Sequence, residues 1–401
     1  MRVLMFDRTT TGVLLVLSVT QLIGWGTIGL PAIVGTQVAV DLHMNISAVF
    51  AGTSVLYVAM GLCAPSLGRV FVQFGARHVM MVGTVVAALG FGVLSVSHKP
   101  AFYFAGWMIL GMAGSATLTT GAYIMLNEVA GRSAKSAIGA LMLVTGLSSS
   151  IFWPTTSLLA ALAGWRGTCV IYAATMIVVC LPLYAWGMPR RKRIEDEGAR
   201  ATIRTNAPRV PKSTFYLMVS AIALNAFVTF GLGAVMIELL KAEGLSPSEA
   251  VAFGSMLGVV QVSARAIDFL GRGRWDGITT GLVAAAALLV AMLILMISGG
   301  SYRTVAIFIL LCGAGSGTLI VARATIPLVF YDKSEFAKAT SRIALPLNLA
   351  SAVSPPLLAD LLVRFGSHGL LGLVALCSCG MFLLLALLGR RRPGIATVAV
   401  R

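Results

Sequence analysis

The hydrophobic pattern of the chain is a succession of long apolar runs separated by short polar breaks. A run of about 20 apolar residues predicts a helix that crosses a lipid bilayer, because the hydrocarbon core is about 30 Å thick. Charged, glycine and proline breaks divide the chain into twelve such spans. They cover residues 11–36, 46–68, 78–97, 101–126, 137–162, 167–188, 214–238, 248–270, 277–298, 303–328, 339–363 and 368–389. The pattern therefore predicts an all-α membrane protein with twelve transmembrane helices.

One break is much longer than the others. Residues 189–213 are polar, mixed in charge and contain three prolines, which predicts a linker between two six-helix bundles, residues 1–188 and 214–401. Basic residues favour the cytoplasmic side of a membrane. With the N-terminus inside, only five of the 30 Lys and Arg residues fall at outer ends, namely Lys99, Arg166, Lys241, Arg303 and Arg364. We therefore expect both termini and the linker to be cytoplasmic, in a cell (inner) membrane.

Composition narrows the class of protein. Residues are 58% hydrophobic and 11% charged, and the mean hydropathy is +0.92, a balance outside the range of soluble domains. In a membrane protein the net charge of +16 reflects basic cytoplasmic loops, and we expect no nucleic-acid partner. The first apolar run continues to Val40 without a signal-peptide cleavage site, so we interpret it as the first span.

Several kinds of chemistry lack their sequence signals. The six cysteines lie in apolar segments without the spacing of a zinc site or a disulfide framework, and no ATP-binding loop is present. The spans hold no nucleophile–base pair. We therefore expect no metal, no cofactor and no enzymatic activity. The expected state is a monomer surrounded by membrane lipid.

The two halves match each other at several positions in the same order. The matched pairs are residues 114–118 with 315–319, Pro154 with Pro355, Gly26 with Gly231, and Arg69 with Arg265. The first two pairs share an offset of 201 residues, and the others have similar offsets. Such recurrence predicts a six-plus-six duplication. At the offset of 201, Arg323 falls on Ala122, so its charge belongs to one half only.

This organisation resembles the major facilitator superfamily over essentially the whole chain. Residues 68–77, which read GRVFVQFGAR, are similar to the family signature G-x-x-x-D-R-x-G-x-R/K after the second span. Val72 and Gln73 replace its usual acid and arginine, so the resemblance carries over only to Gly68, Gly75 and Arg77.

The resemblance implies a bacterial-type secondary transporter with a central cavity that opens alternately to each side. The first, fourth, seventh and tenth spans would line this cavity. The second copy of the signature keeps Arg265 and Asp268 on one helical face. The residues expected to brace the inner gate are Gly68, Arg69, Gly75, Arg77, Arg265 and Asp268.

Arg323 is the charged residue of the apolar segment 305–330, and its place in a helix lies roughly 10 Å inside the inner end. An arginine within a span costs about 2.5–3.5 kcal/mol on insertion scales and usually faces a cavity or the protein interior. Its planar fork suits a carboxylate or another oxyanion. Two alternatives remain: an ion pair with Glu128, or extension of the side chain to the cytoplasmic interface.

The other candidate substrate-binding residues are polar or aromatic side chains on spans expected to line or flank the cavity. They are Trp25, Gln21, Tyr123, Asn225, Tyr57, Gln261, Trp153 and Asn348. Thr119 and Thr120 are left out because a threonine hydroxyl can bond to its own helix.

These residues lead to a functional hypothesis. The sequence predicts a secondary transporter that moves a small organic anion, monocarboxylate-like or another oxyanion, by alternating access with protons as the coupling ion. No acid lies within the first span, and the other acids are peripheral, which favours an anionic over a cationic substrate. The alternative is efflux of drugs or toxic compounds, metalloid or siderophore-like, with Arg323 structural. A transporter-like sensor is disfavoured because residues 189–213 are too few for a signalling domain.

Overall fold

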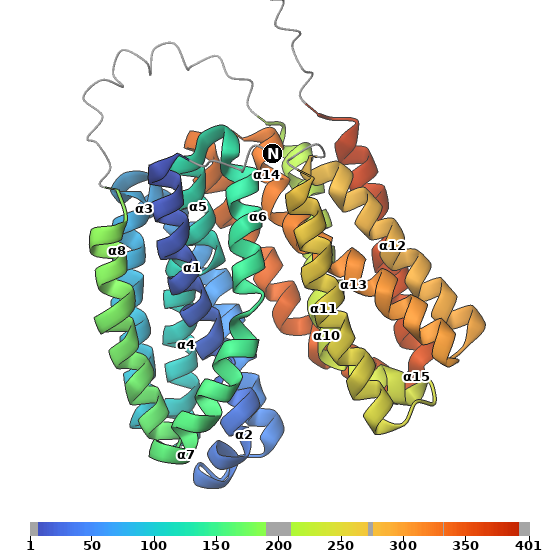
Figure 1. The fold of residues 1–401 in the computed structure, drawn as a ribbon, viewed down its shortest axis with the longest axis horizontal. Helices are drawn as coiled ribbons and strands as arrows, with labels where there is room; N and C mark the ends of the chain where they lie inside the picture. The colour runs from blue at the N-terminus through green and yellow to red at the C-terminus, as the bar shows by residue number, and fades with distance from the viewer. Residues whose placement is uncertain (1–6, 190–209, 272–275, 332, 393–401) are drawn as a thin grey trace, which may run out of the picture.

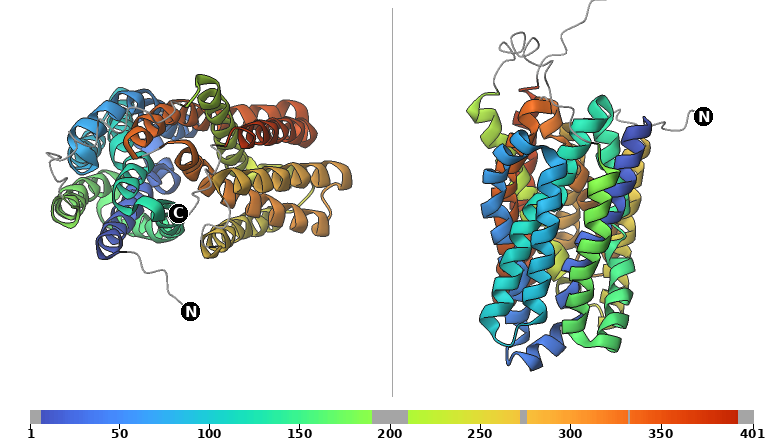
Figure 2. Two further views of the ribbon diagram at one scale, coloured as in Figure 1. Left: turned by 90° about the horizontal axis from the view of Figure 1, so that it is seen from above. Right: turned by 90° about the vertical axis from the view of Figure 1, so that its left-hand side faces the viewer.

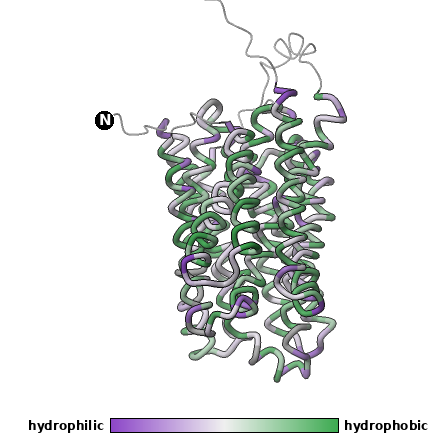
Figure 3. Tube along the Cα trace, turned by 90° about the vertical axis from the view of Figure 1, so that its right-hand side faces the viewer, coloured by the Kyte–Doolittle hydropathy of each residue, from purple (hydrophilic) through white to green (hydrophobic). Residues whose placement is uncertain are grey.

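The computed structural model describes residues 7–189, 210–271, 276–331 and 333–392. This part of the chain is helical, with short turns and no strand. It contains nine helical segments long and apolar enough to cross a membrane, and hydrophobic residues dominate along the length of the helices (Figure 3). The predicted all-α membrane architecture is therefore confirmed. Residues 190–209 of the predicted linker lie outside the described residues.

The helices follow one another without long loops in the described ranges. Those of the first half are α1 (Arg8–Ile28), α2 (Leu30–Asp41), α3 (Ile46–Ser95), α4 (Pro100–Thr117), α5 (Thr119–Ala130), η1 (Gly131–Ser133), α6 (Ala134–Thr145), α7 (Ser148–Thr175), the π-helix η2 (Met176–Cys180) and α8 (Leu181–Gly187). Those of the second half are α10 (Lys212–Ala242), α11 (Pro247–Leu270), α12 (Gly277–Ser298), α13 (Tyr302–Thr325), α14 (Pro327–Phe330) and α15 (Lys333–Gly389).

Three helical segments contain sharp internal turns at glycines. Gly75 in α3, Gly164 in α7 and Gly366 in α15 have φ values of 76°, 68° and 68°, in the left-handed region where glycine has no steric penalty. Each turn separates two rods, and Gly164 and Gly366 are 366 − 164 = 202 residues apart, close to the repeat offset seen in the sequence. The number of twelve spans stays a prediction.

Three other interruptions fall on the first, fourth and tenth predicted spans. Gly29 separates α1 from α2, Leu118 separates α4 from α5, and Pro327 begins α14. A broken helix leaves carbonyl groups without their usual partners. At the α4–α5 break the Thr117 carbonyl accepts a hydrogen bond of 2.6 Å from Nε2 of Gln21 on α1. Gln21 thus stabilises the interruption.

The hydrophobic core is divided into two clusters, one in each half. The first is built from α1–α8 and the second from α10–α15. The first cluster also includes Val321, Ala324, Phe336 and Ala337 from the second half. Figures 1 and 2 show the resulting bundles side by side, with the start of α1 and the end of α15 at the same end of the molecule.

The bundles contact each other along two seams, α3 against α15 and α6 against α11. At the first seam, a Cβ added at Gly68 would lie 3.0 Å from Cβ of Ser341, and one at Gly61 would lie 3.1 Å from the Leu345 carbonyl. At the second, Gly146 lies against Arg265 and Gly139 lies against Phe269. These contacts gather toward the end that holds the Gly75 turn. We call it the closed end; from it the bundles diverge toward the opposite, open end (Figure 1).

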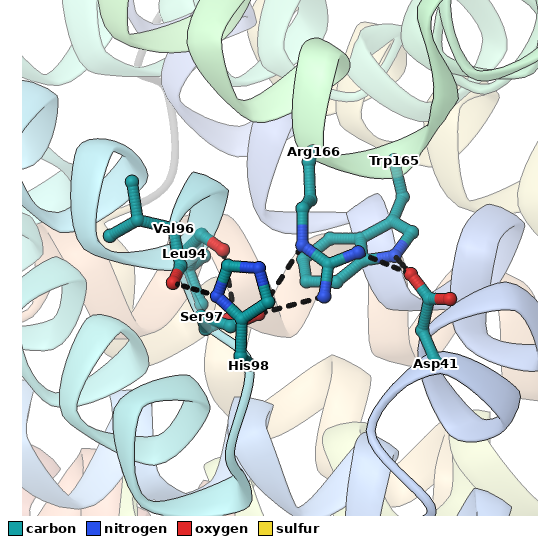
Figure 4. A network of polar contacts seen from close by, with 7 residues as sticks. All are labelled: Asp41, Leu94, Val96, Ser97, His98, Trp165 and Arg166. Carbon is teal, nitrogen blue, oxygen red and sulfur yellow. Dashed lines mark hydrogen bonds and ion pairs between the residues drawn. The ribbon is translucent and has the colours of Figure 1, made fainter.

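At the open end a polar cluster ties together parts of the first bundle (Figure 4). The Asp41 carboxylate, at the end of α2, accepts a hydrogen bond of 2.7 Å from Nε1 of Trp165 and is ion-paired with Arg166. Arg166 also donates a hydrogen bond of 2.9 Å to the Ser97 carbonyl. Because Trp165 and Arg166 follow the Gly164 turn, the cluster fixes that turn against α2 and the α3–α4 connection.

Candidate functional site

A cavity of about 620 Å³, including its open mouth, lies between the two bundles. Both bundles line it, and so do both sides of the α13–α14 break. The lining residues are Trp25, Tyr57, Met60, Thr119, Thr120, Tyr123, Phe230, Arg323, Ala324, Pro327, Thr340, Ile343, Ala344, Leu347 and Asn348.

Arg323 is the cationic residue of this lining. Its guanidinium lies over the Phe230 ring, 5.3 Å from the ring centroid, and Phe230 makes an edge contact of 5.7 Å between centroids with Tyr57. Nη1 of Arg323 is buried without a hydrogen-bond partner, and no ion pair in the described part of the chain involves Arg323. A guanidinium held by an aromatic face and lacking a counterion attracts an anion.

Neither alternative for Arg323 matches this geometry. Glu128 lies in a separate pocket beside Arg77 and His78, and no ion pair joins Glu128 to Arg323 within the described residues. The stacking on Phe230 also holds the side chain in the cavity, so it does not extend to the closed end.

Two further polar groups of the cavity have no partner. Both lie on α15: the Thr340 hydroxyl and Oδ1 of Asn348, whose amide Nδ2 donates to the Ala344 carbonyl at 2.7 Å. A buried polar atom without a hydrogen bond costs about 1–3 kcal/mol. A ligand with a hydroxyl or amino group would satisfy these atoms.

The structure brings together five of the predicted substrate-binding residues. Arg323, Trp25, Tyr57, Tyr123 and Asn348 all line the cavity.

Three other predicted residues bond to neighbouring helices and are not among its lining residues. Gln21 supports the α4–α5 break, Nδ2 of Asn225 donates to the Leu319 carbonyl at 2.9 Å, and Nε2 of Gln261 donates to the Ser316 hydroxyl at 2.9 Å. Oδ1 of Asn225 has no partner. The side chain of Trp153 lies outside the described residues.

The predicted gate residues of the first half lie at the closed end. Gly68 allows close contact of α3 with α15, Gly75 makes the turn within α3, and Arg77 donates a hydrogen bond to the Ala185 carbonyl of α8. Arg69 is exposed.

The second-half pair contacts two different neighbours. The Asp268 carboxylate accepts from the Thr280 hydroxyl at 3.1 Å, whereas Arg265 extends toward Gly146 of the first bundle. The two side chains therefore contact different neighbours, Asp268 on α12 and Arg265 at the first bundle. Side chains three residues apart on a helix differ in direction by about 60°, so each can contact a different neighbouring helix.

The family can now be assigned. A model of the major facilitator superfamily matches residues 13–301, most of the chain. The chain belongs to the major facilitator superfamily. Superfamily members are transporters of small solutes, and the nine candidate spans fit a multi-pass membrane protein.

Sequence relatives within the superfamily are distant. An uncharacterised transporter of Bacillus subtilis, YycB, is 21% identical over 326 residues, covering 80% of this chain and 79% of the relative. Human monocarboxylate transporter 6 is 30% identical over 32% of this chain and 25% of its own length. Human monocarboxylate transporter 11 is 30% identical over 35% of this chain and 31% of its own length.

Solved superfamily structures share the fold. The human organic anion transporter MFSD10 has a TM-score of 0.71 at 17% identity, with 94% of this chain and 99% of that chain covered. The fucose:proton symporter FucP of Escherichia coli also has a TM-score of 0.71, at 14% identity, with 95% and 99% covered. At such identities the likeness shows the fold alone.

Sequence reasoning missed part of this cavity. Phe230 and Thr340 were not selected, and Thr119 and Thr120 were discounted, yet all four line the cavity. Thr229 lies one helical turn after Asn225 on the seventh predicted span, and Phe230 directly follows it. This closeness to Asn225 was the signal in the sequence that Phe230 could line the cavity. Thr340 had no such signal.

Proposed function

We propose that this superfamily member is a secondary transporter that moves a small organic anion by alternating access. The observation that carries the proposal is Arg323. Its half-buried side chain lies in the central cavity over Phe230, its buried Nη1 has no hydrogen-bond partner, and it has no ion pair in the described residues. The anionic group, a carboxylate or a similar oxyanion, binds there through charge-assisted hydrogen bonds.

The rest of the cavity suits the organic part of such a substrate. Trp25, Tyr57, Tyr123 and Phe230 present aromatic surface on both bundles, and aromatic side chains offer large apolar contact area. Two of the similar proteins are monocarboxylate transporters, which supports the same substrate class.

Alternating access follows from where the bundles touch. In the orientation predicted from basic residues, the closed end is cytoplasmic, so the cavity faces outward in this structure. Rocking of one bundle on the other around a fixed site changes the open side. We propose a monomer in a cell (inner) membrane with cytoplasmic termini. The sequence has no ATP-binding loop, so uphill transport would need an ion gradient, and we propose protons as the coupling ion.

Binding to Arg323 variants tests this function. Purified full-length protein is titrated with butyrate, benzoate and lactate by calorimetry. We expect Arg323→Ala to weaken each at least about tenfold, since hydrogen bonds to charged groups contribute about 1.5–3 kcal/mol. Arg323→Lys keeps the charge but loses the planar fork, and its affinity is expected between the two. The control is Arg364→Gln, an exposed arginine paired with Asp360 on α15. Undiminished affinity in both Arg323 variants contradicts the proposal.

The apolar cavity wall also favours a second candidate, efflux of drugs or toxic compounds with Arg323 structural. Four aromatic side chains would accept lipophilic compounds of either charge. The same titrations with lipophilic cations and metalloid species discriminate the two. Binding of cations that is insensitive to Arg323→Ala, together with resistance on expression, favours efflux.

A further inference from the structure

A second guanidinium, that of Arg265, is not among the lining residues of the cavity but acts electrostatically on Tyr123, which lines it. Arg265 on α11 is 9% exposed, and its Nε is buried without a hydrogen-bond partner. As for Arg323, no ion pair in the described part of the chain involves Arg265. The sequence assigned Arg265 to the gate with Asp268, but Asp268 bonds to Thr280 on α12. Asp268 therefore forms no ion pair with Arg265 in the described residues.

The packing of α11 on α13 sets Arg265 and Arg323 at similar depth. Gln261 of α11 bonds to Ser316 of α13, and a Cβ added at Gly317 would lie 2.5 Å from the Gln261 carbonyl, so the two backbones are nearly in contact. Both helices run in the same direction because α12 returns between them. Arg265 follows Gln261 by four residues and Arg323 follows Ser316 by seven, a difference of roughly 4–5 Å along the axes.

The side chain of Arg265 reaches toward the other bundle. Side chains on a helix lean toward its N-terminus, which for α11 and α13 is the direction of the open end. The guanidinium Nη1 of Arg265 lies 3.1 Å from the position of a Cβ added at Gly146, so the absence of a side chain at Gly146 makes room for it. Tyr123, which lines the cavity, is within electrostatic range of both arginines.

The two arginines make an unusual electrostatic site. The positive charge of Arg323 acts unfavourably on that of Arg265, and no Asp or Glu is among the lining residues of the cavity. An uncompensated charge of low exposure is costly until an opposite charge arrives. A monoanion neutralises one guanidinium and leaves the other, whereas a dianion neutralises both.

We propose that Arg265 is a second anion-binding residue and that the preferred solute carries two anionic groups, as a short dicarboxylate does. This inference rests on the proposed function, because it extends the anion site of Arg323. One carboxylate would bind at Arg323 over Phe230, and the other would bind at Arg265 beside Gly146. The aromatic walls then enclose the carbon chain between them.

The test compares ligands that match in length and differ in charge: succinate, its monoamide succinamate, and butyrate. Calorimetry on the purified full-length protein at pH 7.5 keeps every carboxyl ionised. We expect the wild type to bind succinate at least about tenfold more tightly than succinamate, since each factor of ten corresponds to about 1.4 kcal/mol. Arg265→Gln should remove this preference by lowering succinate affinity, and Arg323→Gln should weaken all three ligands. Arg364→Gln should leave all three affinities unchanged.

Each outcome bears on one of the two claims. Equal wild-type affinity for succinate and succinamate overturns the dianion inference, whereas Arg323-dependent butyrate binding still upholds the proposed function. An equal loss of all three ligands in Arg265→Gln also overturns the inference, because it marks Arg265 as structural. If none of the three ligands binds the wild type, both claims fail. Should Arg265→Gln not fold, as judged by gel filtration and thermal melting, Arg265→Lys replaces it, with an intermediate succinate preference expected.

Discussion

The closed and open ends of the molecule are held by different interactions. At the closed end the bundles meet through close van der Waals contact, such as Gly68 against Ser341. At the open end polar ties such as Asp41 with Trp165 and Arg166 stay within one bundle. Each of the five ion pairs between described residues joins two residues of the same bundle, and such pairs occur at both ends.

The difference between packing contacts across the bundles and ion pairs within them affects how the bundles can move. A rocking motion that separates the closed end must break contacts between the bundles, and those contacts are mainly packing. Ion pairs that remain within a bundle move with it and need not break. Rigid bundles joined by a packed interface without ion pairs among the described residues suit the proposed alternating access.

The largest expected effect comes from forcing the closed end apart. In Gly68→Leu the new side chain meets Cβ of Ser341 at 3.0 Å and the Lys338 backbone at 3.3 Å. Overpacking costs about 1–3 kcal/mol, so we expect the equilibrium to shift roughly five- to 150-fold toward a state open at this end. Distances between spin labels at Phe74 and Lys338 would lengthen. Gly92→Leu is the control, because a Cβ at Gly92 in the same α3 segment meets nothing within 4 Å. Equal distance distributions in both variants contradict the prediction.

A smaller effect is expected when a glycine of each seam is replaced by alanine. A Cβ at Gly61 would lie 3.1 Å from the Leu345 carbonyl and 3.2 Å from Cβ of Asn348, whereas one at Gly139 meets Phe269 at an ordinary 3.5 Å. Alanine in a helix gains up to about 1 kcal/mol over glycine. We expect Gly139→Ala to raise the melting temperature and Gly61→Ala to lower it or leave it the same, because strain offsets the gain. A higher melting temperature for Gly61→Ala than for Gly139→Ala would contradict this prediction, because it would show that the α3–α15 seam is the looser of the two.

The smallest expected effect is at the open end. Hydrogen bonds from Trp165 and Arg166 lower the pKa of Asp41 below its ordinary value of 3.8. The stabilisation is therefore present above about pH 4 and is lost as the pH falls through the lowered pKa. We expect Asp41→Asn to melt slightly below the wild type at pH 7, with the difference shrinking toward pH 3.

The control for the open end is the distance between the same labels at Phe74 and Lys338. It should not change in Asp41→Asn, since both partners of Asp41 lie in one bundle. A conformational shift in this variant would mean that the open-end cluster also controls access.

Sequence alone predicted the helices well and the site in part. Apolar runs identify spans without knowledge of packing, and Arg323 is conspicuous in such a run. The orientation of each helix is harder to predict, because helices apolar on all sides show no preferred face. Phe230 and Thr340 were missed for this reason. The sequence does not reveal the partner of Gln21, because the Thr117 carbonyl is freed only by the helix break at Leu118 in the folded chain. Gln21 was therefore predicted to bind substrate.

The unpaired charge in the cavity has a kinetic consequence for the proposed transporter. Closing the open end over an empty cavity would remove the hydration of Arg323 while it has no counterion, which is energetically unfavourable. Closing over a bound anion avoids this penalty. The empty carrier should therefore return slowly and the loaded carrier quickly, so exchange of labelled for unlabelled solute should outpace net uptake into empty vesicles.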